Sequence, residues 1–296
     1  MSPPDLLLTR LEGEYAITRR PAGAPLPRWH TGPGLVSVTQ APDETSILCL
    51  SDRVPEGETT ARGWQAVRVE TLAALDQPGV VLAAVEPVSR SGLGVFVTST
   101  HDRDYLLVRA GQVARAEAAW IAEGHSVCEG GITLRRAGPQ DAEALASLHF
   151  QVWQETYARI APPEVRLALN KARRTAYWHD RLASEGGTVI ALRGNETVGL
   201  TALSPSGVAG FEECAEIDHL YVAASARRSG LGARLLGIAR AQATQSGAPR
   251  LILAVVRENA AALTFYHAQG GAILAERKDK GPLWPSDNLI LGWPAA

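Results

Sequence analysis

The stretch EIDHLYVAASARRSGLGARLLGIARAQATQ, from Glu216 to Gln245, decides the architecture of the second half of this chain. Residues 217–222 have the apolar pattern of a strand, and residues 231–239 carry apolar side chains at helical spacing. Between them lies a turn with two arginines and two glycines, Arg227 to Gly232. Amides at a helix start lie at the positive end of the helix dipole, and glycine lets a bulky anion approach the backbone. The turn therefore predicts a diphosphate site.

This turn differs from the common nucleotide-binding motifs. A P-loop continues with Gly-Lys-Ser/Thr where Ala233-Arg234-Leu235 stands here, and a dinucleotide fingerprint has a third glycine. The sequence RRSGLG after a strand ending in LYV instead resembles the acyl-CoA signature Q/R-x-x-G-x-G/A of the GNAT N-acetyltransferase superfamily. Residues 255–270 are similar to a second GNAT segment, V-x-x-x-N-x-x-A-x-x-F-Y-x-x-x-G, in register with the first. The resemblance covers residues 131–294.

The resemblance implies acetyl-CoA (coenzyme A) as the cofactor. Amides of Arg228 to Ala233 would hold the diphosphate, and residues 220–222 would offer backbone groups to the pantetheine arm. Strands 217–222 and 250–256 would diverge and leave a slot for the thioester. The expected cofactor-binding residues are Leu220, Tyr221, Val222, Arg227, Arg228, Ser229, Gly230, Leu231, Gly232, Ala233, Asn259 and Tyr266.

The expected catalytic residues are Tyr266 and Glu216. By resemblance, Tyr266 lies near the cofactor sulfur; because a thiol has a pKa near 8.5 and a phenol one near 10, a positioned phenol can donate the proton. The alternative is that Tyr266 packs against the cofactor without taking part in proton transfer. Glu216 stands where several family members keep their base, with Asp218 as its rival and with Glu212 and Glu213 as relays through water. Each carboxylate has the alternative of being a solvated strand end.

Strand alternation predicts the faces of these side chains. Glu216, Asp218, Leu220 and Val222 would share one face of their strand. His219 would face the opposite side, where a packed histidine is expected.

The chain departs from the family pattern after the helix of residues 259–270. The family usually has an aromatic residue after the glycine that ends this helix, whereas Gly271 and Ala272 stand here. We expect weaker packing under the cofactor helix as a result.

The second half, residues 131–296, has the order of elements that GNAT proteins show. The mixed sheet and its flanking helices would come from strands at 132–136, 189–192, 197–203, 217–222, 250–256 and 288–293, and from helices at 139–153, 163–182, 231–245 and 259–270. The acceptor pocket would be lined by residues 153–182 and by a loop at 276–285.

The first half, residues 1–128, has a different pattern. Hairpins are expected at 35–50 and 95–108, and from Trp64 onward the order βαββαβ predicts a ferredoxin-like sheet of four strands with two helices on one face. The echo of SVT…DETSIL in FVTSTHDRDYLLV suggests an internal repeat. GEYAITR, SVT…ETSILC, GW and VFVTST…DYLLV resemble the tandem, CASTOR-type ACT domains over residues 1–127. That resemblance implies an amino-acid effector; a plain dimerisation or packing module is the alternative.

Composition excludes several classes of function. With 296 residues, 46% hydrophobic and 20% charged, the α+β and α/β chain has length for about two domains and a large core. A net charge of −2 argues against nucleic acid and anionic membranes, and no apolar run or leader predicts a membrane span. The three cysteines are too far apart for a metal site and fit a cytoplasmic protein.

Three functions remain open from the sequence. The first is an acetyl-CoA-dependent N-acetyltransferase regulated by an amino acid. The second is an amino-acid sensor whose GNAT half binds CoA without catalysis, and the third is a scaffold that recruits a protein partner. The acceptor could be a small amine, an amino acid, a protein N-terminus or a lysine, and a homodimer remains open.

Overall fold

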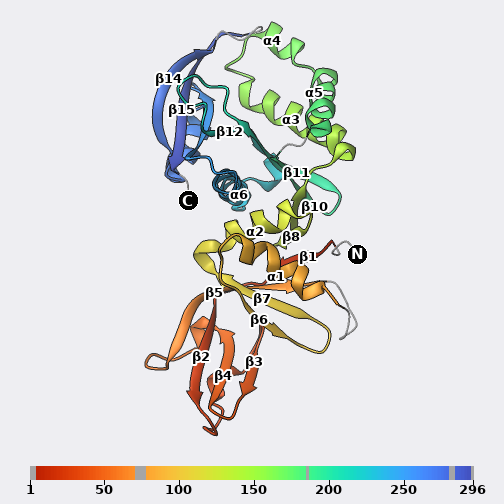
Figure 1. The fold of residues 1–296 in the computed structure, drawn as a ribbon. Helices are drawn as coiled ribbons and strands as arrows, with labels where there is room; N and C mark the ends of the chain where they lie inside the picture. Colours follow the sequence, from red (N-terminus) through yellow and green to blue (C-terminus); the bar gives the residue numbers. More distant parts are fainter. Residues whose placement is uncertain (1–4, 71–77, 185–186, 280–283, 295–296) are drawn as a thin grey trace. The chain divides into compact units, whose positions relative to one another are not determined.

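The computed structural model describes residues 5–70, 78–184, 187–279 and 284–294, and the chain divides into two compact units (Figure 1). The first unit is Met1–Gly130 and the second is Gly131–Ala296. Each unit is described by itself below. Part of the loop expected at 276–285 lies outside the described residues.

The first unit contains the predicted βαββαβ order. Helices α1 and α2 pack against each other and both contact β7, so that they cover one face of the sheet. Trp120 of α2 is fully buried, and its indole N–H donates to the carbonyl oxygen of Ala84 in α1 at 2.7 Å. The six elements are β5 (Thr60–Val69), α1 (Val80–Arg90), β6 (Phe96–Ser99), β7 (Asp104–Arg109), α2 (Val113–Ala122) and β8 (Ser126–Glu129).

The sheet of this unit is wider than the four strands predicted, because β1 (Leu7–Arg10) lies between β5 and β8. It pairs antiparallel with β5 and parallel with β8. Leu8 is fully buried there, and His125 accepts the Leu6 amide at 3.3 Å on Nδ1 while its Nε2 lies 3.0 Å from the Ala83 carbonyl oxygen. Apolar burial and a buried histidine thus fix the chain start inside the sheet.

The suggested internal repeat extends no further than a hairpin: both echoed stretches, residues 37–50 and 96–109, form antiparallel hairpins. Residues 5–57, all of which the structure describes, contain no α-helix and so cannot form a second βαββαβ unit. Three strands of this stretch form a small antiparallel sheet with the first half of β5, in the order β5-β2-β4-β3. The strands are β2 (Tyr15–Pro21), β3 (Ser37–Gln40) and β4 (Glu44–Leu50).

The second unit is a mixed sheet with helices on both faces. Its strand order is β9-β10-β11-β12-β13-β15-β14. Helices α6 and α7 contribute side chains to one face, and α3 and α5 make polar and ring contacts with β12 on the other. The elements are β9 (Ile132–Arg136), α3 (Ala142–Tyr157), α4 (Pro163–Ala168), α5 (Lys171–Ala183), β10 (Gly187–Arg193), β11 (Glu196–Pro205), β12 (Ala215–Val222), α6 (Leu231–Gln245), β13 (Arg250–Val256), α7 (Ala260–Ala268), β14 (Ala272–Asp279) and β15 (Ser286–Pro294).

Two local predictions for this unit are corrected. The helical stretch expected at 163–182 is two helices, because the Asn170 side chain caps α5 by accepting the Arg173 amide at 3.0 Å. The loop expected from residue 276 begins within β14, which pairs antiparallel with β15.

The divergence of the two central parallel strands is confirmed. Strands β12 and β13 are paired at two positions, Ala215 with Leu251 and Glu216 with Ile252. Beyond Glu216, β12 and β13 are no longer paired, so the side of β12 that faces β13 makes no backbone hydrogen bonds to that strand. Apart from the Val222 carbonyl oxygen, which accepts from Arg227 Nε at 3.2 Å, the backbone groups on this side are available to pair with a ligand, as at a sheet edge.

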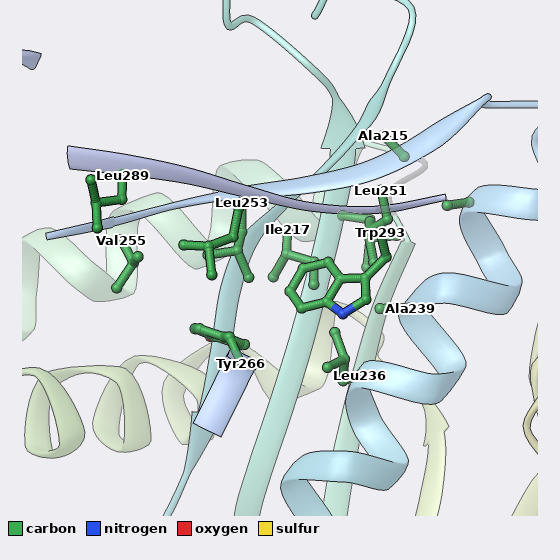
Figure 2. Packing of buried hydrophobic residues seen from close by; sticks show 13 residues of the cluster. Ala215, Ile217, Leu236, Ala239, Leu251, Leu253, Val255, Tyr266, Leu289 and Trp293 are labelled. Carbon is green, nitrogen blue, oxygen red and sulfur yellow. The ribbon is translucent and has the colours of Figure 1, made fainter. Parts of the chain in front are cut away.

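Trp293 of β15 explains the missing aromatic residue after α7. The Cβ that a larger residue would carry at position 271 would lie 2.7 Å from the Trp293 ring, so the indole occupies this space. The indole is fully buried, meets the Tyr266 ring edge-on at 5.8 Å, and donates to the Gln269 carbonyl oxygen at 2.9 Å (Figure 2). The aromatic contact is thus supplied from another strand, and the expectation of weaker packing is wrong.

Trp293→Ala is expected to lower the unfolding free energy of the second unit by roughly 3–5 kcal/mol, the usual cost of emptying a buried tryptophan site. Denaturant unfolding measures the loss. Trp293→Phe, which keeps a ring but not the hydrogen bond, is expected to lose less. A loss below about 1 kcal/mol for the alanine variant would show that the site collapses and that the indole is not a central core residue.

Candidate active site

A cavity of about 850 Å³ opens where β12 and β13 diverge. Six consecutive residues of β12, 217–222, and three of β13, 253–255, line it, as expected for a slot bordered by strand backbone. The remaining lining comes from α3, the turn before α6, and α7: Val152, Glu155, Thr156, Tyr157, Arg227, Arg228, Gly230, Gly232, Ala233, Asn259, Ala261, Ala262, Phe265, Tyr266 and Gln269.

The turn before α6 has the backbone of an anion site. Gly230 is the residue before the helix, with a φ of 85°, and Arg228 has a φ of 63°, which side chains other than glycine seldom adopt. A Cβ on Gly232 would lie 3.3 Å from the Phe265 ring, so this glycine keeps the helix start open. The 15-residue helix directs its free amides and its dipole at this end of the cavity. The residues present fit a diphosphate.

The residues expected at the turn divide into two groups. Arg227 and Arg228 line the cavity, and the Arg227 guanidinium pairs with Glu155 of α3 at 2.9 Å. Ser229 and Leu231 do not line it: the Ser229 hydroxyl donates to the Ala226 carbonyl oxygen at 2.8 Å, and Leu231 is buried. Ser229 and Leu231 can therefore offer a ligand their backbone groups but not their side chains.

The tyrosines Tyr157 and Tyr266 also line the cavity. Tyr266 is buried, and burial raises the pKa of its hydroxyl, so it remains protonated at neutral pH. Burial also raises the pKa of the Tyr157 hydroxyl, and a hydrogen bond from Asn259 partly offsets this rise. Asn259 caps α7 by accepting the Ala262 amide at 3.2 Å. Sequence reasoning placed Tyr157 within the segment 153–182 expected to line the acceptor pocket but gave it no individual role, although its spacing of four from Trp153 places it on the same helix face.

A β-bulge overturns the predicted faces of β12. Ala202 of β11 pairs with His219 and Leu203 pairs with Ile217, so Asp218 is an extra residue in β12. Leu220 consequently packs with Ile217 in the core on the α6 side. Asp218 and His219 both contact α5, so the expectation that Asp218 shares a face with Leu220 and Val222 is wrong. His219 is packed, as expected.

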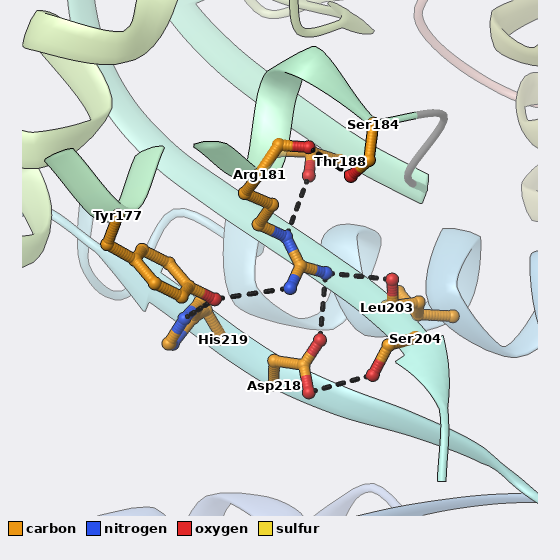
Figure 3. Close-up of polar contacts among 8 residues, drawn as sticks. All are labelled: Tyr177, Arg181, Ser184, Thr188, Leu203, Ser204, Asp218 and His219. Carbon is orange, nitrogen blue, oxygen red and sulfur yellow. Dashed lines mark hydrogen bonds and ion pairs between the residues drawn. The ribbon is translucent and has the colours of Figure 1, made fainter. Parts of the chain in front are cut away.

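A hydrogen-bonded chain connects α5 to β12 (Figure 3). Arg181 pairs with Asp218 at 2.8 Å and donates to the Tyr177 hydroxyl at 3.1 Å, which in turn lies 2.8 Å from His219 Nε2. Ser204 donates to the other Asp218 oxygen at 2.9 Å. Burial, together with the charges of nearby arginines, lowers the pKa of His219 to about 3. His219 is therefore neutral and a poor base.

Carboxylates near the cavity are already engaged. Glu216 is not among the lining residues; it accepts the Ser206 hydroxyl at 3.0 Å, and burial raises the pKa of its carboxyl. The acidic side chains that do line the cavity, Glu155 and Asp218, each form an ion pair. No described carboxylate that lines the cavity is therefore unpaired.

A mixed sheet whose central parallel strands diverge beside a glycine-rich helix start defines the GNAT-fold class of acyltransferases. A model of the Acetyltransferase (GNAT) family matches residues 147–270. A model of the ACT domain matches residues 59–119, and a model described as an N-terminal domain matches residues 13–57.

Known proteins agree with the family models. The chain is 30% identical over 141 residues to a probable N-acetyltransferase of Mycobacterium tuberculosis, Rv2775, covering 46% of this chain and 76% of that protein. It is 30% identical over 140 residues to an uncharacterized N-acetyltransferase of Bacillus subtilis, YhfO, covering 47% and 89%. The chain belongs to the GNAT family of acetyltransferases and carries an ACT domain before it.

A solved N-acetyltransferase structure is similar to this chain. The PaiA N-acetyltransferase of Thermoplasma acidophilum, in complex with coenzyme A, is 20% identical with a TM-score of 0.44, covering 55% of this chain and 98% of that one. Among the described residues, no helix is long and apolar enough to cross a membrane, and no group of three or more potential metal ligands occurs.

Proposed function

We propose that this protein transfers the acetyl group of acetyl-CoA to an amine. The observation that carries the proposal is the cavity between β12 and β13, whose lining includes both the α6 turn and Tyr266. A diphosphate at the turn and a pantetheine arm along the free edge of β12 would direct the thioester toward Tyr266. Acetyl-CoA supplies the activated acetyl group.

The proposed roles follow from the positions of the side chains. Amides of Arg228 to Ala233 hold the diphosphate, and backbone groups of Leu220 to Val222 orient the arm. The amine nitrogen bonds to the acetyl carbon, the carbon–sulfur bond breaks, and the phenol of Tyr266 gives its proton to the departing sulfur. Burial keeps this phenol protonated at neutral pH but, by raising its pKa, also makes it a weaker acid, so the proposed role rests on the position of Tyr266 in the cavity wall.

A base must take the proton that the amine loses. We keep Glu216 for this role, acting through water, because burial raises the pKa of its carboxyl toward the working pH. Asp218 lies closer to the cavity but is paired with Arg181. If Glu216 is the base, Glu216→Gln removes the acidic limb of the pH–rate profile and Asp218→Asn leaves it; the reverse result assigns the base to Asp218.

We further propose that an amino acid bound to the ACT-containing unit regulates the transfer, and that the protein works in the cytoplasm. The match to an ACT domain at residues 59–119 supports the first part. An amino acid that changes kcat or KM without itself being acetylated would establish regulation. Kinetics that no such amino acid alters would leave this unit as a packing or dimerisation module.

The direct test of the catalytic proposal is release of free CoA thiol from acetyl-CoA in the presence of a panel of amines. Turnover with at least one amine is expected. Binding of CoA by calorimetry without thiol release for any amine would contradict catalysis.

That negative outcome would favour a CoA-binding sensor. The observation behind this second candidate is that the carboxylates lining the cavity, Glu155 and Asp218, are both held in ion pairs. A sensor would show coupled binding of CoA and an amino acid, with each changing the affinity for the other by the same factor.

A further inference from the structure

Arg174 of α5 is a cation without a carboxylate partner among the described residues. Its guanidinium is partly buried, and its Nε atom has no hydrogen-bond partner there. Nearby acids are committed elsewhere: Glu155 pairs with Arg227, Asp218 pairs with Arg181, and Glu143 accepts the Thr175 hydroxyl at 3.3 Å. Arg174 is thus a partly buried positive charge on the α5 side of β12 that no described carboxylate compensates.

The surroundings of Arg174 are aromatic and neutral. The guanidinium carbon lies 5.7 Å from the centre of the Trp153 ring. Burial lowers the pKa of Arg174, which means that the charged form is penalised at this position. Burying an unpaired charge is costly unless an opposite charge joins it. An uncompensated guanidinium in such a place is typical of a binding site for an anionic group.

Two imidazoles add donors or acceptors beside this charge. His149 and His219 have ring centres 4.6 Å apart, and the Nδ1 atom of each is buried without a hydrogen-bond partner among the described residues. The Tyr177 hydroxyl accepts from Arg181, so its own proton is free to be donated to His219 Nε2. This arrangement satisfies both groups and places the proton of the neutral His219 on Nδ1. His219 then offers an N–H that the chain does not use.

This cluster borders the cavity already described. His219 and Tyr221 line that cavity, and Tyr221 lies 4.8 Å from His149 between ring centres. Trp153, which Arg174 faces, packs on Tyr157 at 5.1 Å, and Tyr157 also lines the cavity. Arg174 does not itself line the cavity, so a small molecule there would reach the guanidinium past the side chains of Tyr157, His219 and Tyr221.

We propose that the acceptor is an amino acid or another amine that carries a carboxylate, and that Arg174 pairs with this carboxylate. The proposal rests on the acetyl-transfer function. The planar fork of a guanidinium matches the two oxygens of a carboxylate, and the Nδ1–H of His219 supplies a further donor. One guanidinium and one neutral donor complement a single negative charge, whereas a phosphate dianion would require more positive charge. The acceptor amine then lies on the side of the thioester.

The test compares acceptors that differ in the carboxylate alone. Wild-type protein, Arg174→Gln and the neighbouring control Arg173→Gln are assayed by thiol release with the common L-amino acids, their amides and their decarboxylated amines. For the accepted amino acid, Arg174→Gln is expected to lower kcat/KM by about 30-fold or more, mainly through KM; this corresponds to about 2 kcal/mol at 1.4 kcal/mol per factor of ten. Turnover of the matching decarboxylated amine, which has no carboxylate for Arg174 to bind, should fall far less in Arg174→Gln, and the loss for the amide, whose carbonyl oxygen can still accept from the guanidinium, should lie between the two.

Two kinetic results would overturn the proposal while the acetyl-transfer function stands. One is equal wild-type kcat/KM for an amino acid and its decarboxylated amine, or a preference for phosphorylated amines. The other is an equal loss for all acceptors in Arg174→Gln. Affinity for CoA, measured on the same variants, should not change, and a fall there would assign Arg174 to the cofactor instead.

A binding measurement decides the matter if no amine is acetylated. Thermal shifts with the same amino acids are recorded at saturating CoA for wild type and Arg174→Gln, since sites in the ACT-containing unit contribute equally to both. A shift that depends on Arg174 supports a carboxylate site even without turnover, and identical shifts overturn it. Arg174→Lys, which keeps the charge but loses the fork, serves if the glutamine variant does not fold.

Discussion

Replacing Tyr266 with phenylalanine is expected to lower kcat for acetyl transfer on the order of 10²–10³-fold, within the range for loss of a general acid. The cavity keeps its shape, because the ring still packs against Trp293 and Phe265. The departing thiolate, however, must then take its proton from water. Stopped-flow or steady-state thiol release gives kcat, and calorimetry gives the CoA dissociation constant, which should change less than about threefold.

The split between kcat and affinity distinguishes proton donation from packing. Tyr105→Phe, which makes the same change in the ACT-containing unit, is the matched control and should retain wild-type kcat. If Tyr266→Phe retains wild-type kcat, Tyr266 is a packing residue and the proton comes from elsewhere. Tyr157, a second buried phenol on the cavity, would then be the next candidate.

Introducing an aspartate at Gly232 is expected to weaken CoA binding on the order of 100-fold, because like charges brought together at an interface cost several kcal/mol. The new Cβ would press on the Phe265 ring at 3.3 Å, and the carboxylate would meet the diphosphate. The fold itself should tolerate the change, since an acidic residue in the first turn favours the helix dipole. Calorimetric titration with CoA measures the loss.

The matched control is Gly94→Asp, in the other unit. Gly94 is exposed, its φ lies outside the left-handed region, and no heavy atom would contact an added Cβ within 4 Å. It carries the same change in charge and should bind CoA like wild type. Unchanged CoA affinity in Gly232→Asp would remove the diphosphate from this turn and with it the proposed direction of the cofactor.

Sequence reasoning succeeded where the signal is local. The Arg227–Gly232 turn follows from a strand, two glycines and a helix start within sixteen residues of one another, and the βαββαβ order follows from periodicity alone. Both are properties of a continuous segment. The divergence of β12 and β13 was expected through family resemblance, which carries over the same local motifs.

The failures involve partners far away in the chain. The bulge at Asp218 depends on how Leu203 and Ala202 pair with β12, and alternation within one strand cannot reveal an extra residue. Packing around Gly271 depends on Trp293, which comes after another strand. Arg174 could not be singled out from the sequence either. Its lack of a carboxylate partner is visible once the structure shows which side chains the nearby carboxylates pair with.

The position of β1 has a consequence for the way the first unit forms. Leu6 and His125, which meet beside β1 and β8, are 119 positions apart in the chain. During synthesis one edge of β1 can pair with β5, but the other edge must remain unsatisfied until α2 and β8 have left the ribosome. Long-range closure of this kind slows folding relative to local hairpins. The ACT match at residues 59–119 excludes both β1 and β8, so a fragment cut at those limits would lack two strands of its own sheet.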